Sequence, residues 1–186
     1  MSKKTILILA LFCLLITQSC TRSPKPNVYV ENEKSELLDI LMRKTDFEIS
    51  STWSFYSIRQ HVETPTEQNH WLIEVASAGL VGDYDNKHYV HVLHRLEKYN
   101  KQVDWINSTT LDTDENEELI NISFPVLGDN SQSNCYLATY IHCKIVVQYD
   151  YILSYVSLHG PRTLSNDDIL EMLVPVLMEI DERMNQ

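Results

Sequence analysis

The chain of 186 residues is 44% hydrophobic and 22% charged, which is the composition of an ordinary globular domain. Its 4 glycines are about 2% of the sequence, against a usual share of roughly 7%. Rossmann fingerprints and phosphate-cradling loops need several glycines within a few residues, so the scarcity argues against both. The 26 Asp and Glu residues outnumber the 15 Lys and Arg residues, for a formal net charge of −11. Such a surface repels phosphate backbones and anionic headgroups, and we expect no nucleic-acid partner.

The first 20 residues have the pattern of a secretory signal peptide. Lys3 and Lys4 come first, and an apolar run of eleven residues from Ile6 to Ile16 leads to a short polar stretch before Cys20. A helix of that length spans about 17 Å, whereas the hydrocarbon core of a bilayer is roughly 30 Å thick. The segment is therefore too short for a transmembrane helix. Its removal leaves 13 basic against 26 acidic residues, a formal charge of −13.

The stretch Ile16-Thr17-Gln18-Ser19-Cys20 resembles the lipobox of bacterial lipoproteins, with the small Ser19 directly before the cysteine. Thr17 stands where that family usually has leucine, and Gln18 stands where a small residue is common. The resemblance implies removal of residues 1–19, a diacylglyceryl thioether on Cys20 and usually an acyl chain on its new amino group. It also implies a position on the extracytoplasmic face of the bacterial cell membrane or outer membrane.

Ordinary signal-peptidase cleavage is the alternative, because Thr17 and Ser19 also satisfy the small-x-small rule, and it would yield a secreted protein. The cysteine count favours lipidation. An acylated Cys20 leaves Cys135 and Cys143 as an even pair in an oxidising compartment, since Cys13 is lost with the signal in either case. Several acyl chains then anchor the protein durably in the membrane.

After the signal, residues 20–32 are polar and contain two prolines, which predicts a lipidated N-terminus and a tether without packed structure. Residues 33–186 are predicted to form a single α+β domain. It begins with a short helix over Glu33–Arg43, which places four apolar residues on one face: Leu37, Leu38, Leu41 and Met42.

Apolar and β-branched runs predict strands over Trp53–Val62, His70–Val81, His88–Leu96, part of Leu119–Val126, Cys135–Tyr149 and Ile152–Leu158. A loop is expected over Gly128–Asn134, and a second short helix is expected within Glu97–Ser108. Ser165 and Asp168 form a capping-box pair at the start of a last helix. Pro175 lies inside that helix and is expected to kink or split it.

Runs of strands followed by helices favour an α+β fold. We expect an antiparallel sheet of about six strands with a short N-terminal helix, a middle helix and a kinked C-terminal helix. This order of elements is similar to that of PsbP/Mog1-like domains of exported proteins. The resemblance is one of element order, and it implies no functional residue.

Cys135 and Cys143 are a candidate disulfide whose formation depends on the path of the chain. If Cys135–Tyr149 is one straight strand, the two Cα atoms lie about 27 Å apart and cannot be bridged. If the chain reverses near Thr139, they face each other across a tight hairpin. The expected compartment favours pairing, whereas Leu137–Ile141 contains no typical turn residue.

The spacing His88-x-x-His91-x-x-His94 does not by itself bring three imidazoles to one metal ion. On a strand, His88 and His94 face one way and His91 faces the other. We therefore expect partly exposed histidines and assign no metal ligand.

The segment from Asp112 to Asn116 imitates the first half of a calcium loop. Glu117 stands where such a loop requires glycine, and Ser123 stands where it requires a bidentate glutamate. We expect a solvated acidic loop, and no cofactor is assigned.

No G-x-S-x-G elbow, S-x-x-K or H-E-x-x-H motif occurs in the sequence. Ser157 and His159 match no known nucleophile arrangement, and on a strand His142 points away from Cys143. No catalytic residue is assigned. The sequence favours a non-enzymatic, lipid-anchored binding or accessory domain of the cell envelope, with an unknown protein or small-molecule partner. The alternative is an extracytoplasmic hydrolase whose site converges from distant positions.

Overall fold

The computed structural model describes residues 35–47, 53–63, 71–84, 88–102 and 118–186. In chain order these form α2 (Glu36–Ile40), the 3-10 helix η1 (Lys44–Asp46), β1 (Trp53–Glu63), β2 (Leu72–Tyr84), β3 (His88–Tyr99), β4 (Glu118–Ile120), β5 (Asn130–Leu137), β6 (Ile141–Tyr149), β7 (Ile152–Gly160) and α3 (Asn166–Met184). Residues Ser35–Gln186 form one compact unit. The signal segment, Cys20 and the predicted tether lie outside the described residues.

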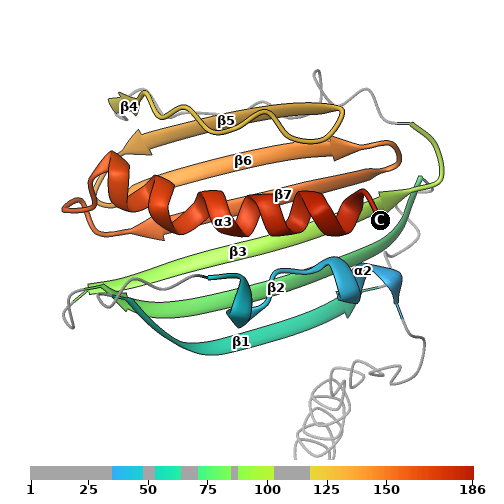
Figure 1. Cartoon of the computed structure of the whole chain (residues 1–186), viewed down its shortest axis with the longest axis horizontal. Helices are drawn as coiled ribbons and strands as arrows, with labels where there is room; N and C mark the ends of the chain where they lie inside the picture. The colour runs from blue at the N-terminus through green and yellow to red at the C-terminus, as the bar shows by residue number, and fades with distance from the viewer. Residues whose placement is uncertain (1–34, 48–52, 64–70, 85–87, 103–117) are drawn as a thin grey trace, which may run out of the picture. The chain divides into compact units, whose positions relative to one another are not determined.

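The strands form one seven-stranded sheet in the order β1-β2-β3-β7-β6-β5-β4. Every neighbouring pair is antiparallel. The two sequential groups, β1 to β3 and β4 to β7, join where residues 91–98 of β3 pair with residues 152–159 of β7. Figure 1 shows α3 lying across one face of this sheet, with α2 and η1 on the same face. The α+β class is confirmed, with seven strands instead of the expected six.

The additional strand comes from the predicted run Cys135–Tyr149, which is a hairpin and not one strand. The chain reverses over residues 138–140, where the Ala138 N–H donates to the Tyr140 carbonyl at 3.0 Å. The first strand of the hairpin also takes in residues 130–134, which were expected to be a loop. Their one-to-one pairing with the apolar β6 outweighs their local preference for turns.

The first predicted helix is shorter in the structure, where it is divided between α2 and η1. Leu37, Leu41 and Met42 are fully buried, as expected, but Leu41 and Met42 follow the end of α2 and are not part of a helical face. The expected middle helix is wrong over residues 97–99, because they continue β3. There Glu97 and Lys98 pair with Leu153 and Ile152 of β7, and this pairing favours a strand. Residues 103–108 of that prediction lie outside the described part of the chain.

The last helix starts as the sequence indicates. The Asp168 N–H donates to Ser165 Oγ at 3.1 Å, and the Ser165 N–H donates to Asp168 Oδ2 at 2.9 Å, which confirms the capping box. α3 continues through Pro175 without interruption, so of the two expected effects, a kink or a split, the split is wrong. The carbonyl that loses its usual donor at Pro175 belongs to Glu171, an exposed residue, and water can satisfy it there.

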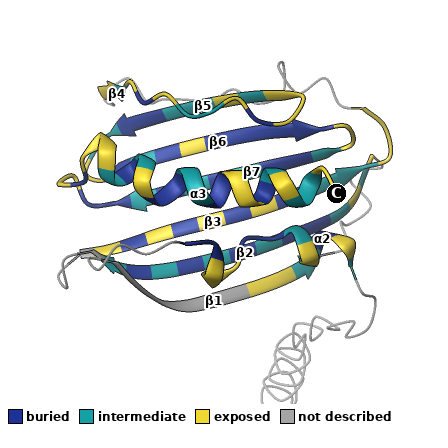
Figure 2. Ribbon diagram, in the orientation of Figure 1, coloured by how far each residue is buried: buried dark blue, intermediate teal, exposed yellow. Residues whose placement is uncertain are grey.

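The hydrophobic core lies between the helices and the sheet, and Figure 2 shows the buried stripe of α3 facing the strands. The helix buries Ile169, Leu173, Val176, Leu177 and Ile180. The sheet contributes alternate residues of its central strands, among them Val92, Leu96, Ile145, Val147, Val156 and Leu158. The remaining alternate residues point to the opposite face, here called the outer face, which no helix of the described chain covers.

Candidate functional site

A serine and a histidine from distant strands meet in the core. His94 of β3 and Ser154 of β7 are 0% and 1% exposed, and His94 Nε2 lies 3.0 Å from Ser154 Oγ. The backbone N–H of Met42 donates to His94 Nδ1 at 3.0 Å. Because Nδ1 is thus an acceptor, the proton of the neutral ring sits on Nε2, which donates to Ser154 Oγ. A general base must instead accept the serine proton at that nitrogen, so the pair is a structural link.

The surroundings of His94 keep it uncharged. Burial lowers its pKa to about 3, and the positive charge of Arg183 adds to the effect. Through its hydrogen bonds to Met42 and Ser154, the neutral ring links the N-terminal segment to the sheet. The expectation of a partly exposed side chain is wrong for His94, because its position in β3 turns it toward the helix-covered face.

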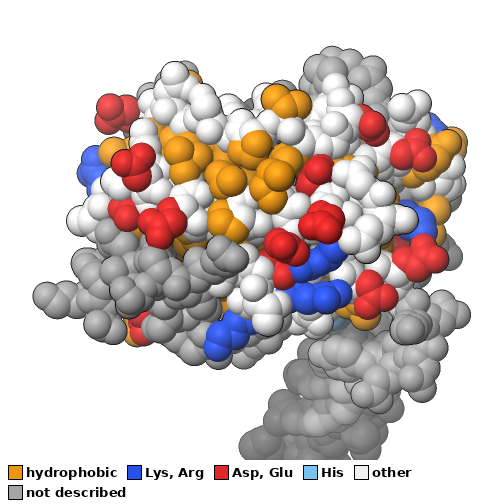
Figure 3. All heavy atoms as spheres, in the orientation of Figure 1, with side chains coloured by type: hydrophobic (Ala, Val, Ile, Leu, Met, Phe, Trp, Pro, Cys, Tyr) orange, Lys and Arg blue, Asp and Glu red, His pale blue; other side chains and the backbone are white. Residues whose placement is uncertain are grey.

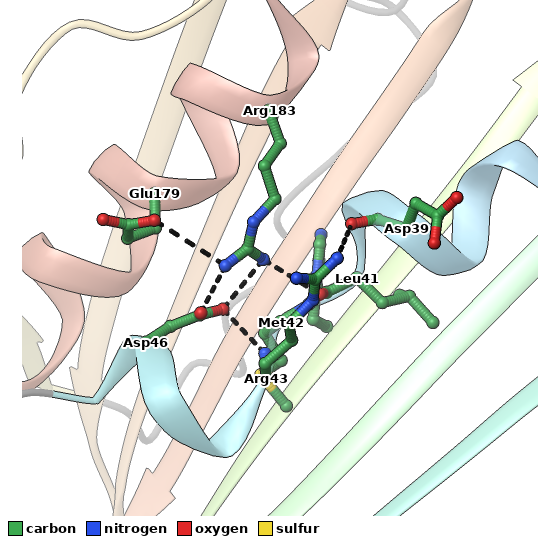
Figure 4. Close-up of polar contacts among 8 residues, drawn as sticks. Asp39, Leu41, Met42, Arg43, Asp46, Glu179 and Arg183 are labelled. Atoms are coloured by element: carbon green, nitrogen blue, oxygen red, sulfur yellow. Dashed lines mark hydrogen bonds and ion pairs between the residues drawn. The ribbon is translucent and has the colours of Figure 1, made fainter.

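A charged cluster near the end of α3 holds the N-terminal elements in place (Figure 4). Arg183 Nη1 donates to Asp46 Oδ2 at 2.9 Å and to the Leu41 carbonyl at 3.1 Å. Its Nη2 pairs with Asp46 Oδ1 and lies 3.7 Å from Glu179. The Asp46 side chain is 3% exposed and that of Arg183 is 15% exposed. The cluster borders a hollow of about 640 Å³, and its charges are already paired within the protein.

A second hollow, of about 580 Å³, is lined by three carboxylates: Asp129, Asp150 and Asp181. Asp181 Oδ1 accepts hydrogen bonds from the Tyr149 hydroxyl at 2.9 Å and from the Gly128 N–H at 3.0 Å. Asp129 Oδ2 accepts one from the Asp150 N–H at 2.7 Å. Burial, and then the bond to Asp181, raise the pKa of Tyr149. These carboxylates hold the loop at Gly128, whose φ of 55° is one that glycine adopts without strain.

The outer face carries a row of histidines that crosses three neighbouring strands. His91 of β3 stands opposite His159 of β7, which stands opposite His142 of β6. The ring centroids are 6.3 Å apart in the first pair and 4.2 Å apart in the second. Tyr136 of β5 stacks on His142 at 5.0 Å, and Tyr140 lies 4.7 Å from His159. We call His91, His142 and His159 the histidine row.

The ring nitrogens of the histidine row differ from those of His94. Within the described part of the chain, no hydrogen bond or ion pair engages them. His91 is exposed, and the other two rings are half-buried. Partial burial, followed by the proximity of His142 and His91, lowers the pKa of His159. The three imidazoles are thus at least partly exposed, and their nitrogens have no partner among the described residues.

Farther along the outer face, Glu97 is the centre of a polar cluster. Arg95 Nε lies 2.7 Å from one of its oxygens, and the Tyr99 hydroxyl donates to the other at 2.6 Å. Burial, and then the bond to Glu97, raise the pKa of Tyr99. Between this cluster and the histidine row lies Leu93, which is 55% exposed. The outer face thus combines ordered polar groups with exposed apolar surface.

Of the other residues considered in the sequence, the structure describes the two cysteines of the candidate disulfide. Cys135 and Cys143 form a disulfide with a Cα–Cα distance of 4.1 Å, since the chain reverses between them. The side chain of His88 and the acidic segment at Asp112 lie outside the described residues, as does Cys20. Among the described residues, no group of three or more His, Cys, Asp or Glu side chains is arranged to hold a metal ion.

The sequence offers His91, His142 and His159 only in three separate patterns, none of which indicates the row. Each member lies on the outward side of its own strand, and this alternation is readable locally. Their alignment depends on the pairing of β3 with β7, two strands separated by about sixty residues in the sequence. No local signal specifies that register.

Comparison with models of protein families, with curated proteins and with solved structures finds no match to this chain. In the described part of the chain, no helix combines the length and apolar character needed to cross a membrane.

Proposed function

We propose that this chain is a lipid-anchored extracytoplasmic protein whose folded part is a non-enzymatic binding or accessory domain of the cell envelope. The observation that carries the binding role is the contrast between the two faces of the sheet. On the helix-covered side, His94, Asp46 and Asp181 are engaged in structural contacts. The nitrogens of the histidine row on the outer face have no partner among the described residues, and its rings are exposed or half-buried.

The anchor is supported by the lipobox-like stretch that ends at Cys20. Ser35, the first described residue, follows Cys20 by 15 residues, and an extended chain of that length reaches about 50 Å. This is long enough for a domain held away from the bilayer. The Cys135–Cys143 disulfide also supports an extracytoplasmic location, because such bonds persist in oxidising compartments.

A hydrolase, the alternative function, has less support from the described residues. The Ser154–His94 pair has the wrong tautomer for a nucleophile and its base, and both side chains are buried. Asp181 would have to leave Tyr149 and Gly128 before it acted as an acid or base. A binding role requires neither change.

The anchor is tested by the variant Cys20→Ser in a bacterial host. We expect the native protein to require detergent for extraction and the variant to be soluble. The mass of the membrane-bound form should show the loss of residues 1–19 and the addition of a diacylglyceryl group and an acyl chain. The matched control is Cys13→Ser, which changes a cysteine that is removed with the signal and should leave extraction unchanged. Membrane partitioning of Cys20→Ser, or retention of Met1 without a fatty acid, would refute the anchor.

A further inference from the structure

We infer that the histidine row binds a divalent transition-metal ion, with His159 as one ligand and His142 or His91 as the other. Three properties support this site: the rings belong to adjacent strands, they lie on an accessible face, and their nitrogens have no partner among the described residues. His94 shows what a structural histidine looks like in the same sheet, with a hydrogen bond at each nitrogen.

The spacing of the rings fits a shared ion. Two imidazoles that bind one ion at bonds of 2.0–2.1 Å in a tetrahedral arrangement have ring centroids about 5 Å apart. The observed distances of 4.2 Å for His142–His159 and 6.3 Å for His91–His159 lie on either side of this value. Small side-chain rotations of half-buried and exposed rings therefore suffice to form either pair.

His159 must be the common ligand because of its position in the middle of the row. His91 and His142 belong to strands on either side of β7, so their backbones are separated by about 10 Å, twice the usual strand spacing. Neither of these two can readily share an ion with the other. Replacement of His159 should consequently abolish the site, whereas replacement of either neighbour leaves a pair.

The donor set determines which ion is expected. Imidazole favours zinc, copper and nickel, whereas calcium and magnesium prefer oxygen ligands. Two protein ligands leave coordination positions for water or for a donor from a partner molecule. The site is therefore an open one, suited to exchangeable metal or to a metal-bridged contact.

The experiment is a calorimetric titration of the detergent-solubilised, mature full-length protein with zinc chloride and copper chloride. We expect one ion per chain, and no comparable heat with magnesium chloride. His159→Gln should weaken binding at least about tenfold, since even groups that only orient metal ligands have effects of that size. His91→Gln and His142→Gln should each weaken it less than His159→Gln does.

The matched control is His61→Gln, which replaces an exposed histidine of β1 outside the row and should leave binding unchanged. As a second readout, copper should broaden the nuclear resonances of His159 and a neighbour while those of buried His94 stay sharp. The inference is overturned if the folded native protein binds neither zinc nor copper. It is equally overturned if His159→Gln retains native affinity or if His61→Gln loses it. None of these outcomes depends on lipidation of Cys20, so the anchor and the metal site are tested separately.

Discussion

His91 and His94 are three positions apart in β3 and have opposite surroundings. An odd spacing along a strand places two side chains on opposite faces of the sheet. His94 points toward the helices, where both of its nitrogens form hydrogen bonds. His91 points outward, where it joins the histidine row. The same residue type therefore contributes to stability at one position and offers a ligand at the other.

The buried ring makes stability depend on pH. The pKa of His94 is about 3 in the folded protein and 6.5 without burial, so between these values the unfolded chain binds more protons. This contribution to stability is complete above pH 6.5 and declines as the pH falls toward 3. The expected slope is about 1.4 kcal/mol per pH unit in the free energy of unfolding. Urea denaturation at a series of pH values within this window measures it.

The control is His94→Gln, which retains a donor and an acceptor but does not titrate. Its unfolding free energy should vary less steeply with pH in the same window, by about the same 1.4 kcal/mol per unit. Parallel slopes for the variant and the native protein would show that other groups cause the pH dependence.

Arg183 provides a second residue-level prediction, because it neutralises a carboxylate that is almost fully buried. Arg183→Met leaves Asp46 without its bidentate partner and should lower the free energy of unfolding by about 3 kcal/mol. Chemical denaturation checks this value. Arg162→Ala, at an exposed arginine, should change it by no more than about 0.5 kcal/mol.

The double variant Asp46→Asn/Arg183→Met tests the cause. It removes the uncompensated charge and should recover part of the stability lost in Arg183→Met. A double variant less stable than the single one would point to lost packing of the arginine, and not to a buried charge.

At the level of elements, the sequence was informative about the strand type and less so about where strands end. The alternation in β3 and the apolar character of β6 and β7 predicted their existence. The sequence does not decide whether the chain reverses between β5 and β6, because residues 138–140 include neither glycine nor proline. Pairing with β7 on one side and β5 on the other fixes β6, and these contacts are not local.

The disulfide across this hairpin should stabilise it. Cys135 and Cys143 are 8 residues apart, and the entropy lost by closing a loop of that size raises the free energy of the unfolded chain by about 2.5 kcal/mol at room temperature. Cys135→Ala/Cys143→Ala should lose about that much free energy of unfolding, as measured by urea denaturation. A reductant should destabilise the native protein and leave the double variant unchanged. A similar loss in both would mean that the reductant acts elsewhere.

At the level of the whole molecule, the two faces of the sheet have different chemistry. α3 carries six acidic residues (Asp167, Asp168, Glu171, Glu179, Asp181 and Glu182) and one basic residue, Arg183. Figure 3 shows acidic side chains spread over this helix-covered face, together with exposed hydrophobic ones. The outer face carries the histidine row, Arg95 and Lys144. The imidazoles of the histidine row therefore lie on the side of the sheet opposite the acidic helix.

The sequence by itself determined most of the strands, the last helix with its capping by Ser165, and the apolar stripe of that helix. These features depend on neighbours within a few residues, and their periodicity is visible locally. It also supplied the whole case for Cys20, which rests on a linear motif. The tertiary structure alone decided that His94 is buried, that Cys135 meets Cys143 and that three histidines align. Each of these depends on strand register and on which face the helices cover, and both are set by contacts between residues far apart in the chain.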